Sequence, residues 1–156
     1  MSKVILITII VVLLVVVMLG IYFMFGNSNK SLFPGSQNAN NFEIQGMKVE
    51  ILKQGSGEGA KAGDYITLHY IGTLEDGKEF DSSINRNAPF VFQLGQSRVI
   101  KGMDLGLVGM KVGEKRKLTI PPELAYGLDG FPPLIPKKAT LIYIVDLLKM
   151  GSTPQF

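Results

Sequence analysis

Few polar residues in this 156-residue chain could carry acid–base, nucleophilic or metal chemistry. The chain has no cysteine and one histidine, His69, which excludes thiolate catalysis, cysteine-ligated zinc and histidine-pair metal sites. Three carboxylates, Glu79, Asp81 and Asp104, are candidates for acid–base work, but nothing in their spacing selects a pair. His69 lies opposite the apolar face of a predicted strand, so we expect an exposed polar residue and no metal site.

Two short motifs are weak indications of ligand binding. Residues 55–60 match the G-x-G-x-x-A pattern of dinucleotide sites, but a strand follows where such a site needs a helix, so we interpret them as a surface turn. The basic run at residues 115–117 is interpreted as a solvated edge. The net charge of +3 comes from mixed signs, which disfavours nucleic acid as a partner. The sequence therefore predicts no cofactor and no nucleic-acid site.

Short strands and one short helix must position these side chains. Alternating apolar residues predict strands over 48–53, 65–71, 90–94, 115–120 and 139–148, with a tight hairpin turn at Asp76-Gly77. Apolar residues at helical spacing predict an amphipathic helix of about two to three turns, formed around Val99, Ile100, Met103, Leu107, Val108 and Met110. Three glycines weaken this helix, so it must rely on packing. The pattern predicts an α+β domain in which an antiparallel sheet covers one short helix.

The amino-terminal segment is strongly apolar. Residues 4–25 carry no charge, and as a helix they would span roughly 33 Å, enough to cross a bilayer core of about 30 Å. The alternative is a cleaved signal peptide, whose apolar region would be about 7–15 residues long and followed by small residues. Because this run is longer and ends in Tyr22-Phe-Met-Phe25, we predict an uncleaved transmembrane helix within residues 1–25.

The remaining chain is predicted to divide into a flexible linker over 26–45, rich in Asn, Ser and Gly, and a globular domain over 46–156. Lys3 and the amino terminus flank the apolar segment on one side, and Lys30 lies beyond its other end. This weak charge bias leads us to expect a single-pass membrane protein whose domain lies outside the cytoplasm.

Three stretches of the globular part resemble the FKBP-type peptidyl-prolyl isomerases. They are residues 69–83 (HYIGTLEDGKEFDSS), residues 99–103 (VIKGM) followed by 109–114 (GMKVGE), and residues 124–127 (LAYG). Their order and intervals agree with the family across roughly residues 47–150. The resemblance implies an antiparallel sheet curled around a short helix, in agreement with the α+β pattern.

The resemblance also implies an apolar pocket between helix and sheet that holds a proline ring. Its aromatic walls would be Tyr70, Phe80, Phe90 and Tyr143, although core packing alone is the alternative for each ring. Met103 would form the floor. Further substrate contacts would come from the turn before the helix and from the loop over the pocket, at Val99, Ile100, Leu134 and Ile135.

The polar groups implied by the resemblance are equally few. The backbone amide of Ile100 and the hydroxyl of Tyr126 would donate hydrogen bonds to a ligand, and Asp81 would be a buried acceptor paired with Tyr70 or Arg86. The chain departs from the familiar family pattern at three positions: Met103 stands in place of Trp, Phe131 in place of a loop His, and Tyr143 in place of Phe. The loop over 127–138 is too short for the inserted chaperone domain of some bacterial relatives.

The implied function is peptidyl-prolyl cis-trans isomerisation of proline-containing polypeptides, during the folding of extracytoplasmic or membrane proteins. Such an enzyme binds the twisted amide better than either planar isomer and needs no nucleophile, metal or cofactor. Macrolides such as tacrolimus are the expected inhibitors, and a monomer is the expected state. The alternative is a membrane-tethered chaperone or binding module that grips proline segments with little turnover.

Overall fold

The computed structural model describes residues 40–154 of the chain. The predicted transmembrane helix, and the predicted linker as far as residue 39, lie outside the described residues. Within residues 40–154, no helix is both long and apolar enough to cross a membrane. The described residues all belong to one compact unit.

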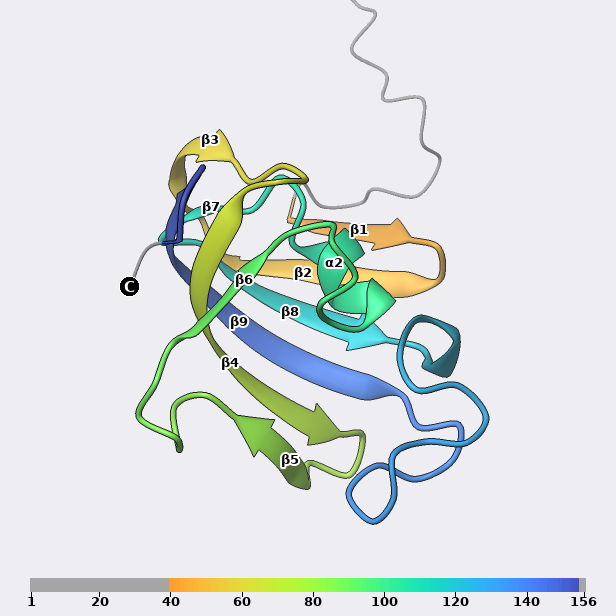
Figure 1. The fold of residues 1–156 in the computed structure, drawn as a ribbon. Coiled ribbons are helices and arrows are strands. Elements are labelled where there is room, and N and C mark those ends of the chain that lie inside the picture. Colours follow the sequence, from red (N-terminus) through yellow and green to blue (C-terminus); the bar gives the residue numbers. More distant parts are fainter. Residues whose placement is uncertain (1–39, 155–156) are drawn as a thin grey trace, which may run out of the picture. The chain divides into compact units, whose positions relative to one another are not determined.

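An antiparallel sheet forms the frame of the described domain (Figure 1). Its strands run in the order β1 (Asn41–Ile44), β2 (Met47–Lys53), β8 (Lys115–Ile120), β9 (Leu141–Gly151), β4 (Tyr65–Leu74) and β5 (Glu79–Ser82), and β6 (Phe90–Gln93) pairs with β4 beside β5. A separate small sheet joins β3 (Ser56–Gly59) and β7 (Lys111–Val112). The predicted antiparallel α+β architecture is therefore confirmed.

Helix α2 (Lys101–Gly106) packs on this sheet through its glycines. A Cβ built on Gly102 would lie 2.3 Å from Ile120 Cγ2, and one on Gly106 would lie 2.9 Å from Leu118 Cδ1. The backbone of α2 therefore lies directly against the side chains of β8. A short 3₁₀ helix, η1 (Pro122–Leu124), follows β8.

The helix is shorter than the predicted two to three turns. It ends at Gly106, and Gly109 has a φ of 74°, which carries the chain out of the helical path before Met110. Met110 is nonetheless fully buried, so its apolar character reflects the core and not a helix face. The dependence of the helix on packing is borne out by its close approach to β8.

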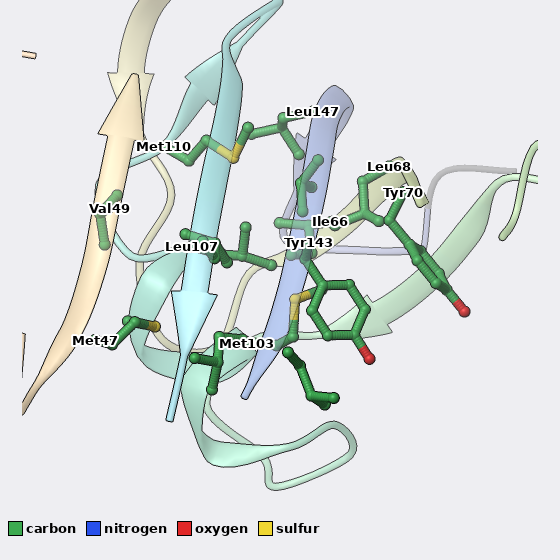
Figure 2. Close-up of a cluster of buried hydrophobic side chains, with 14 of the residues drawn as sticks. Met47, Val49, Ile66, Leu68, Tyr70, Met103, Leu107, Met110, Tyr143 and Leu147 are labelled. Atoms are coloured by element: carbon green, nitrogen blue, oxygen red, sulfur yellow. The ribbon is translucent and has the colours of Figure 1, made fainter. Parts of the chain in front are cut away.

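The buried core lies between α2 and the sheet (Figure 2). Met47 and Val49 enter it from β2, and Leu118 and Ile120 from β8, all with no measurable exposure. Helix α2 and the residue after it contribute Met103 and Leu107 from the other side. These residues fix the helix over the sheet and so set the position of the turn that precedes it.

The predicted linker is wrong for residues 41–45. Residues 41–44 form β1, which pairs with β2 in the register Phe42↔Val49 and Ile44↔Met47. The turn between the strands is Gln45-Gly46, with φ values of 50° and 83°. Positive φ at both central residues suits a tight hairpin, and this turn recruits a mostly exposed segment into the sheet.

Two further interpretations are corrected. Residues 56–59 are not a simple surface turn, because they form β3 and pair with β7. The basic run at 115–117 is not a solvated edge, because β8 lies between β2 and β9 and Arg116 is 3% exposed.

Arg116 forms a buried ion pair with Glu114 and holds the end of α2. Its Nη1 donates to the carbonyl oxygens of Gly106 at 2.7 Å and Val108 at 3.1 Å. Cations stabilise helix carboxyl ends, where backbone carbonyls lack partners within the helix. Arg116 therefore fixes the end of α2 opposite to the turn at Ile100.

Candidate active site

Four aromatic rings from four strands gather beside α2. The ring centroid of Tyr70 lies 5.8 Å from that of Phe90 and 5.8 Å from that of Tyr143, and Phe80 lies 5.6 Å from Tyr143. Antiparallel pairing of β4 with β5, β6 and β9 brings these residues together from distant parts of the sequence. We call these four residues the aromatic cluster. They are the four that the family resemblance assigned to the pocket walls.

Helix α2 and the turn before it lie next to the aromatic cluster. Met103 is 3% exposed and belongs to the same buried group as Tyr70 and Tyr143 (Figure 2). Val99 and Ile100 are partly buried and pack against this group. The carbonyl of Ile100 accepts hydrogen bonds from the amides of Met103 and Asp104, at 2.9 and 3.2 Å. Among residues 40–154 the amide of Ile100 has no protein acceptor, so it remains a free donor beside apolar surface.

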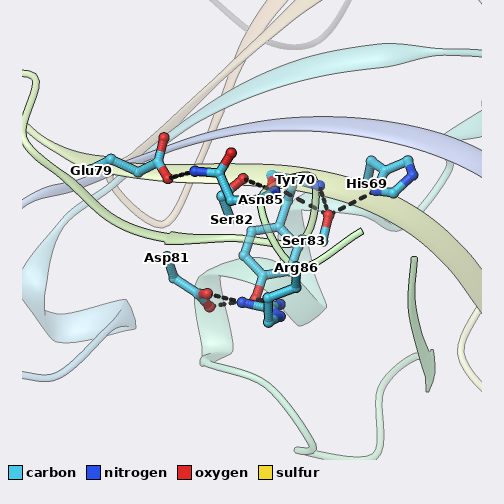
Figure 3. Close-up of polar contacts among 8 residues, drawn as sticks. All are labelled: His69, Tyr70, Glu79, Asp81, Ser82, Ser83, Asn85 and Arg86. Atoms are coloured by element: carbon cyan, nitrogen blue, oxygen red, sulfur yellow. Dashed lines mark hydrogen bonds and ion pairs between the residues drawn. The ribbon is translucent and has the colours of Figure 1, made fainter. Parts of the chain in front are cut away.

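Asp81, Tyr70 and Arg86 form a closed hydrogen-bonded network (Figure 3). The Tyr70 hydroxyl and the Arg86 guanidinium both donate to the Asp81 carboxylate, and Arg86 Nη2 donates to the Tyr70 hydroxyl at 2.8 Å. The sequence left open whether Asp81 pairs with Tyr70 or with Arg86, and in the structure it pairs with both. It is not the buried acceptor that was expected, since its side chain is 39% exposed.

This network also affects the tyrosine itself. Burial, followed by the hydrogen bond to Asp81, raises the pKa of Tyr70 above its usual value. The guanidinium carbon of Arg86 lies 5.5 Å from the centre of the Tyr70 ring, within the range of a cation–π contact. The network therefore holds the ring of Tyr70 from its polar end.

The loop after η1 carries the second free donor. Tyr126 stacks on Phe131 with ring centroids 5.6 Å apart, and its hydroxyl has no partner among the described residues. Burial of the ring, together with the negative charge of Asp81, raises the pKa of Tyr126. The charge of Asp81 therefore acts on this hydroxyl, although Asp81 and Tyr126 come from different parts of the chain.

The tip of this loop is well ordered by its own hydrogen bonds. The amides of Phe131 and Ile135 donate to each other's carbonyls at 2.8 and 2.9 Å. Leu134 is 48% exposed, as expected for a residue over the site, but Ile135 is 3% exposed. Ile135 therefore packs into the same buried group as Met103 and Tyr143, and its expected contact with substrate stays a prediction.

The remaining polar candidates do not converge on a catalytic group. Glu79 accepts a hydrogen bond from Asn85 Nδ2 at 2.6 Å, and Asp104 accepts from the amides of Gly95 and Ser97 at 3.0 Å each. Each carboxylate thus stabilises a local turn or contact. Among Glu79, Asp81 and Asp104, each carboxylate binds a different partner, so these three form no acid–base pair.

His69 and Ser83 form a contact that sequence reasoning missed. His69 is half-buried, not exposed, and its Nδ1 lies 2.9 Å from Ser83 Oγ. Ser83 Oγ also accepts the backbone amide of Tyr70 at 2.9 Å (Figure 3). This fully buried serine therefore ties the segment after β5 to the strand that carries Tyr70.

An antiparallel sheet over one short helix, with aromatic rings and two free hydrogen-bond donors, defines a site for non-covalent binding of an apolar group. Comparison of the chain with known proteins agrees with a site of this class. The model of the FKBP-type peptidyl-prolyl cis-trans isomerase family matches residues 56–148. The chain belongs to this family, and its activity is peptidyl-prolyl cis-trans isomerisation.

Individual relatives support the same assignment. FK506-binding protein 1 of Candida glabrata is 52% identical over 107 residues, which cover 68% of this chain and 94% of that protein. The human peptidyl-prolyl cis-trans isomerase FKBP2 is 59% identical over 91 residues, covering 58% of this chain and 64% of the relative. The crystal structure of FkpA from Escherichia coli matches with a TM-score of 0.67 and 40% identity, over 75% of this chain and 55% of FkpA.

Proposed function

We propose that the aromatic cluster and Met103 accelerate X-Pro rotation by binding the twisted amide without covalent chemistry. The barrier to peptide rotation is about 18–20 kcal/mol because twisting destroys amide resonance. A twisted amide nitrogen is less polar than a planar one and gains more from apolar surroundings. The cluster offers such surroundings, and binding that favours the twisted state over both planar isomers lowers the barrier.

The observation that carries this proposal is the pair of free donors beside the cluster. The amide of Ile100 and the hydroxyl of Tyr126 have no protein acceptor among residues 40–154. Both can donate to carbonyl oxygens on either side of the bound proline. The raised pKa of Tyr126 keeps its hydroxyl protonated, and therefore a donor, throughout the physiological range.

An isomerisation assay on the full chain in mild detergent tests this mechanism. Line-shape or exchange NMR on an Ala-Leu-Pro-Phe peptide needs no coupled protease, and uncatalysed exchange takes tens to hundreds of seconds. We expect clear acceleration, with a lower kcat/KM for Tyr126→Phe and little change for Lys53→Ala, at an exposed residue of β2. Background exchange by a folded chain that still binds the peptide would instead favour a binding module with little turnover.

FK506 is a second ligand that this site is proposed to take. The proposal rests on the name of the Candida glabrata relative, FK506-binding protein 1, and on the two donors, which a macrolide can also use. Thermal stabilisation of the chain by FK506, lost in Tyr126→Phe, would support it. A titration with FK506 that shows no heat of binding, together with no thermal stabilisation at high drug concentration, would reject the proposal.

We further propose that residues 1–25 anchor a monomeric enzyme in a membrane with its domain outside the cytoplasm. The uncharged run over 4–25 and the position of Lys3 support this arrangement. Its substrates would then be proteins that fold in or beyond the membrane. Protease treatment of intact cells or spheroplasts should cleave the domain. Full protection would reverse the orientation, and recovery of the chain without detergent would contradict the anchor.

A further inference from the structure

A cavity lies beside β6, next to the aromatic cluster. It has a volume of about 400 Å³, within the range of about 300–1,000 Å³ that ligand pockets occupy. Its lining residues come from β4, from β6 and from the loop after β6: Tyr65, Phe90, Val91, Phe92, Gln93 and Arg98. Phe90 lines this cavity and also belongs to the aromatic cluster, so the two are adjacent.

The cavity follows the open edge of β6. Successive strand residues point to opposite faces of a sheet, and this cavity touches every residue from Phe90 to Gln93. It therefore runs along the strand and not over one face. Within the described residues β6 pairs only with β4, which leaves its other edge unpaired.

Backbone hydrogen-bonding groups are available along this edge. Leu94, the residue after β6, forms two backbone hydrogen bonds with the segment before β4. Its amide donates to the carbonyl of Asp64 at 2.8 Å, and its carbonyl accepts from the amide of Gly63 at 2.9 Å. Because these groups alternate between the two edges of an antiparallel strand, those of Val91 and Gln93 point to the open edge. No described residue outside β4 pairs with their main chain.

The rim of the cavity carries an unpaired positive charge. Arg98 is exposed, and its guanidinium makes no ion pair or hydrogen bond with any of residues 40–154. The loop that presents it is held in place, because Asp104 of α2 accepts the amides of Gly95 and Ser97 at 3.0 Å each. The backbone that carries Arg98 is thus anchored at the preceding residue, two positions before the free amide of Ile100.

We propose that the edge of β6 is an extended subsite for the polypeptide that carries the proline, and that Arg98 selects an acidic side chain there. The segment on one side of the proline adds to β6 as an extra strand, pairing with Val91 and Gln93. At about 3.3 Å per residue, a segment of four residues spans roughly 13 Å, the length of β6. Adding a strand to a sheet edge is a general way of binding extended peptides. The inference rests on the proposed function, because it requires the proline at the aromatic cluster.

Peptide length and charge test this subsite. Ala-Leu-Pro-Phe is compared with peptides that add four residues before or after it, with Glu, Gln or Lys at each added position in turn. The assay uses the full chain in mild detergent. We expect one added position, on one side of the proline only, at which the Glu peptide has a kcat/KM about two- to fivefold higher than the Lys peptide. The preference should shrink at high salt.

Variants then assign the preference to Arg98. Arg98→Glu should reverse the preference for Glu over Lys while leaving turnover of the unextended peptide unchanged. Lys53→Glu makes the same charge change at an exposed residue of β2 and should leave the preference unaltered. Replacing single amides of the extension with esters should lower kcat/KM at every second residue. Equal rates for Glu and Lys peptides, or equal effects of the two variants, would overturn the proposal.

The two proposals fail in different ways. Loss of turnover for Ala-Leu-Pro-Phe itself would contradict the proposed mechanism, and the β6 edge would then be judged by fluorescence anisotropy of the labelled extended peptides. Binding that prefers Glu and depends on Arg98 would support the subsite, and binding indifferent to charge would reject it. Normal turnover of the short peptide without any charge preference in the long ones would reject the subsite alone.

Discussion

The ring of Phe80 lies directly against the backbone of Gly72. A Cβ built on Gly72 would lie 2.7 Å from Phe80 Cζ and 3.0 Å from Tyr143 Cε1. Only a residue without a side chain lets both rings close over β4, so Gly72 determines the spacing within the aromatic cluster.

Gly72→Ala should therefore disturb catalysis more than folding. The added methyl group must push the two rings apart, at a cost of about 1–3 kcal/mol in stability. We expect a severalfold fall in kcat/KM with the chain still folded, measured by isomerisation kinetics and urea unfolding. Thr73→Ala, at the next residue of β4, is the control. Unchanged kinetics in Gly72→Ala would show that ring spacing does not matter.

Tyr70→Phe tests the network around Asp81. The substitution keeps the ring and removes the hydroxyl that contacts both Asp81 and Arg86. Because Asp81 and Arg86 are 39% and 48% exposed, we expect a loss of at most about 1 kcal/mol. A double-mutant cycle with Asp81→Asn should give a coupling energy of similar size. Strict additivity of the two substitutions would mean that the network contributes no stability.

Arg116→Met should be among the most destabilising single substitutions in the domain. It leaves Glu114 buried without its cation and leaves the carbonyls of Gly106 and Val108 without their donor. Breaking a buried ion pair from one side costs about 3–5 kcal/mol.

The double variant Glu114→Leu with Arg116→Met is the matched comparison. It removes both charges, so it should recover part of the lost stability in urea unfolding. If the double variant were less stable than Arg116→Met, the buried charge of Glu114 would not be the cause.

Alkaline pH should destabilise the folded domain through Tyr143. Burial, then the neighbouring Tyr126, Tyr70 and Asp81, raise the pKa of Tyr143 well above the usual tyrosine value of about 10. The folded state therefore holds this proton more tightly than the unfolded state. Its contribution is complete below about pH 10 and falls as the pH rises further, by at most about 1.4 kcal/mol per pH unit.

Urea unfolding between pH 8 and pH 11.5 measures this loss. Tyr143→Phe should flatten the decline above pH 10, whereas Tyr126→Phe, at a more exposed ring, should change it less. A decline in Tyr143→Phe as steep as in the unmodified chain would assign the effect to other groups.

Met103→Ala should affect both stability and the site. Met103 is 3% exposed, so truncation should cost about 2–5 kcal/mol and widen the space beside the aromatic cluster. We expect weaker proline-peptide binding in the folded variant. Met103→Trp should tighten macrolide binding if the larger ring is accommodated, or cost about 1–3 kcal/mol if it overpacks. Unchanged stability, turnover and drug binding in Met103→Ala would remove Met103 from the floor of the site.

Periodicity predicted the elements whose burial alternates. Strands β2, β6 and β8 begin and end within a residue or two of their predicted bounds. The hairpin at Asp76-Gly77 is confirmed, with the amide of Gly77 donating to Leu74 at 3.0 Å. Strand β1 was missed because its burial is slight and a turn, not an apolar pattern, brings it into the sheet.

Buried charge was the harder case. Arg116 has the same strand parity as Leu118 and Ile120, and this parity indicates an inward side chain. Because Arg116 is charged, we interpreted it as part of a solvated edge. Glu114, two residues earlier, was the signal in the sequence that this charge could be paired and buried. The aromatic cluster could not be predicted from pattern at all, because residues from four strands look like ordinary core positions. Only the family resemblance singled them out.

The glycine contacts of α2 bear on how this site can change during evolution. Gly102 and Gly106 meet Ile120 and Leu118 with no side chain between, so these two glycines hold α2 close to β8 on either side of residue 103. Substitution at this single position can therefore alter the surface offered to a ligand while the helix stays where it is. A change of ligand preference among homologues can therefore begin at this one buried position, at whatever cost in stability the new side chain brings.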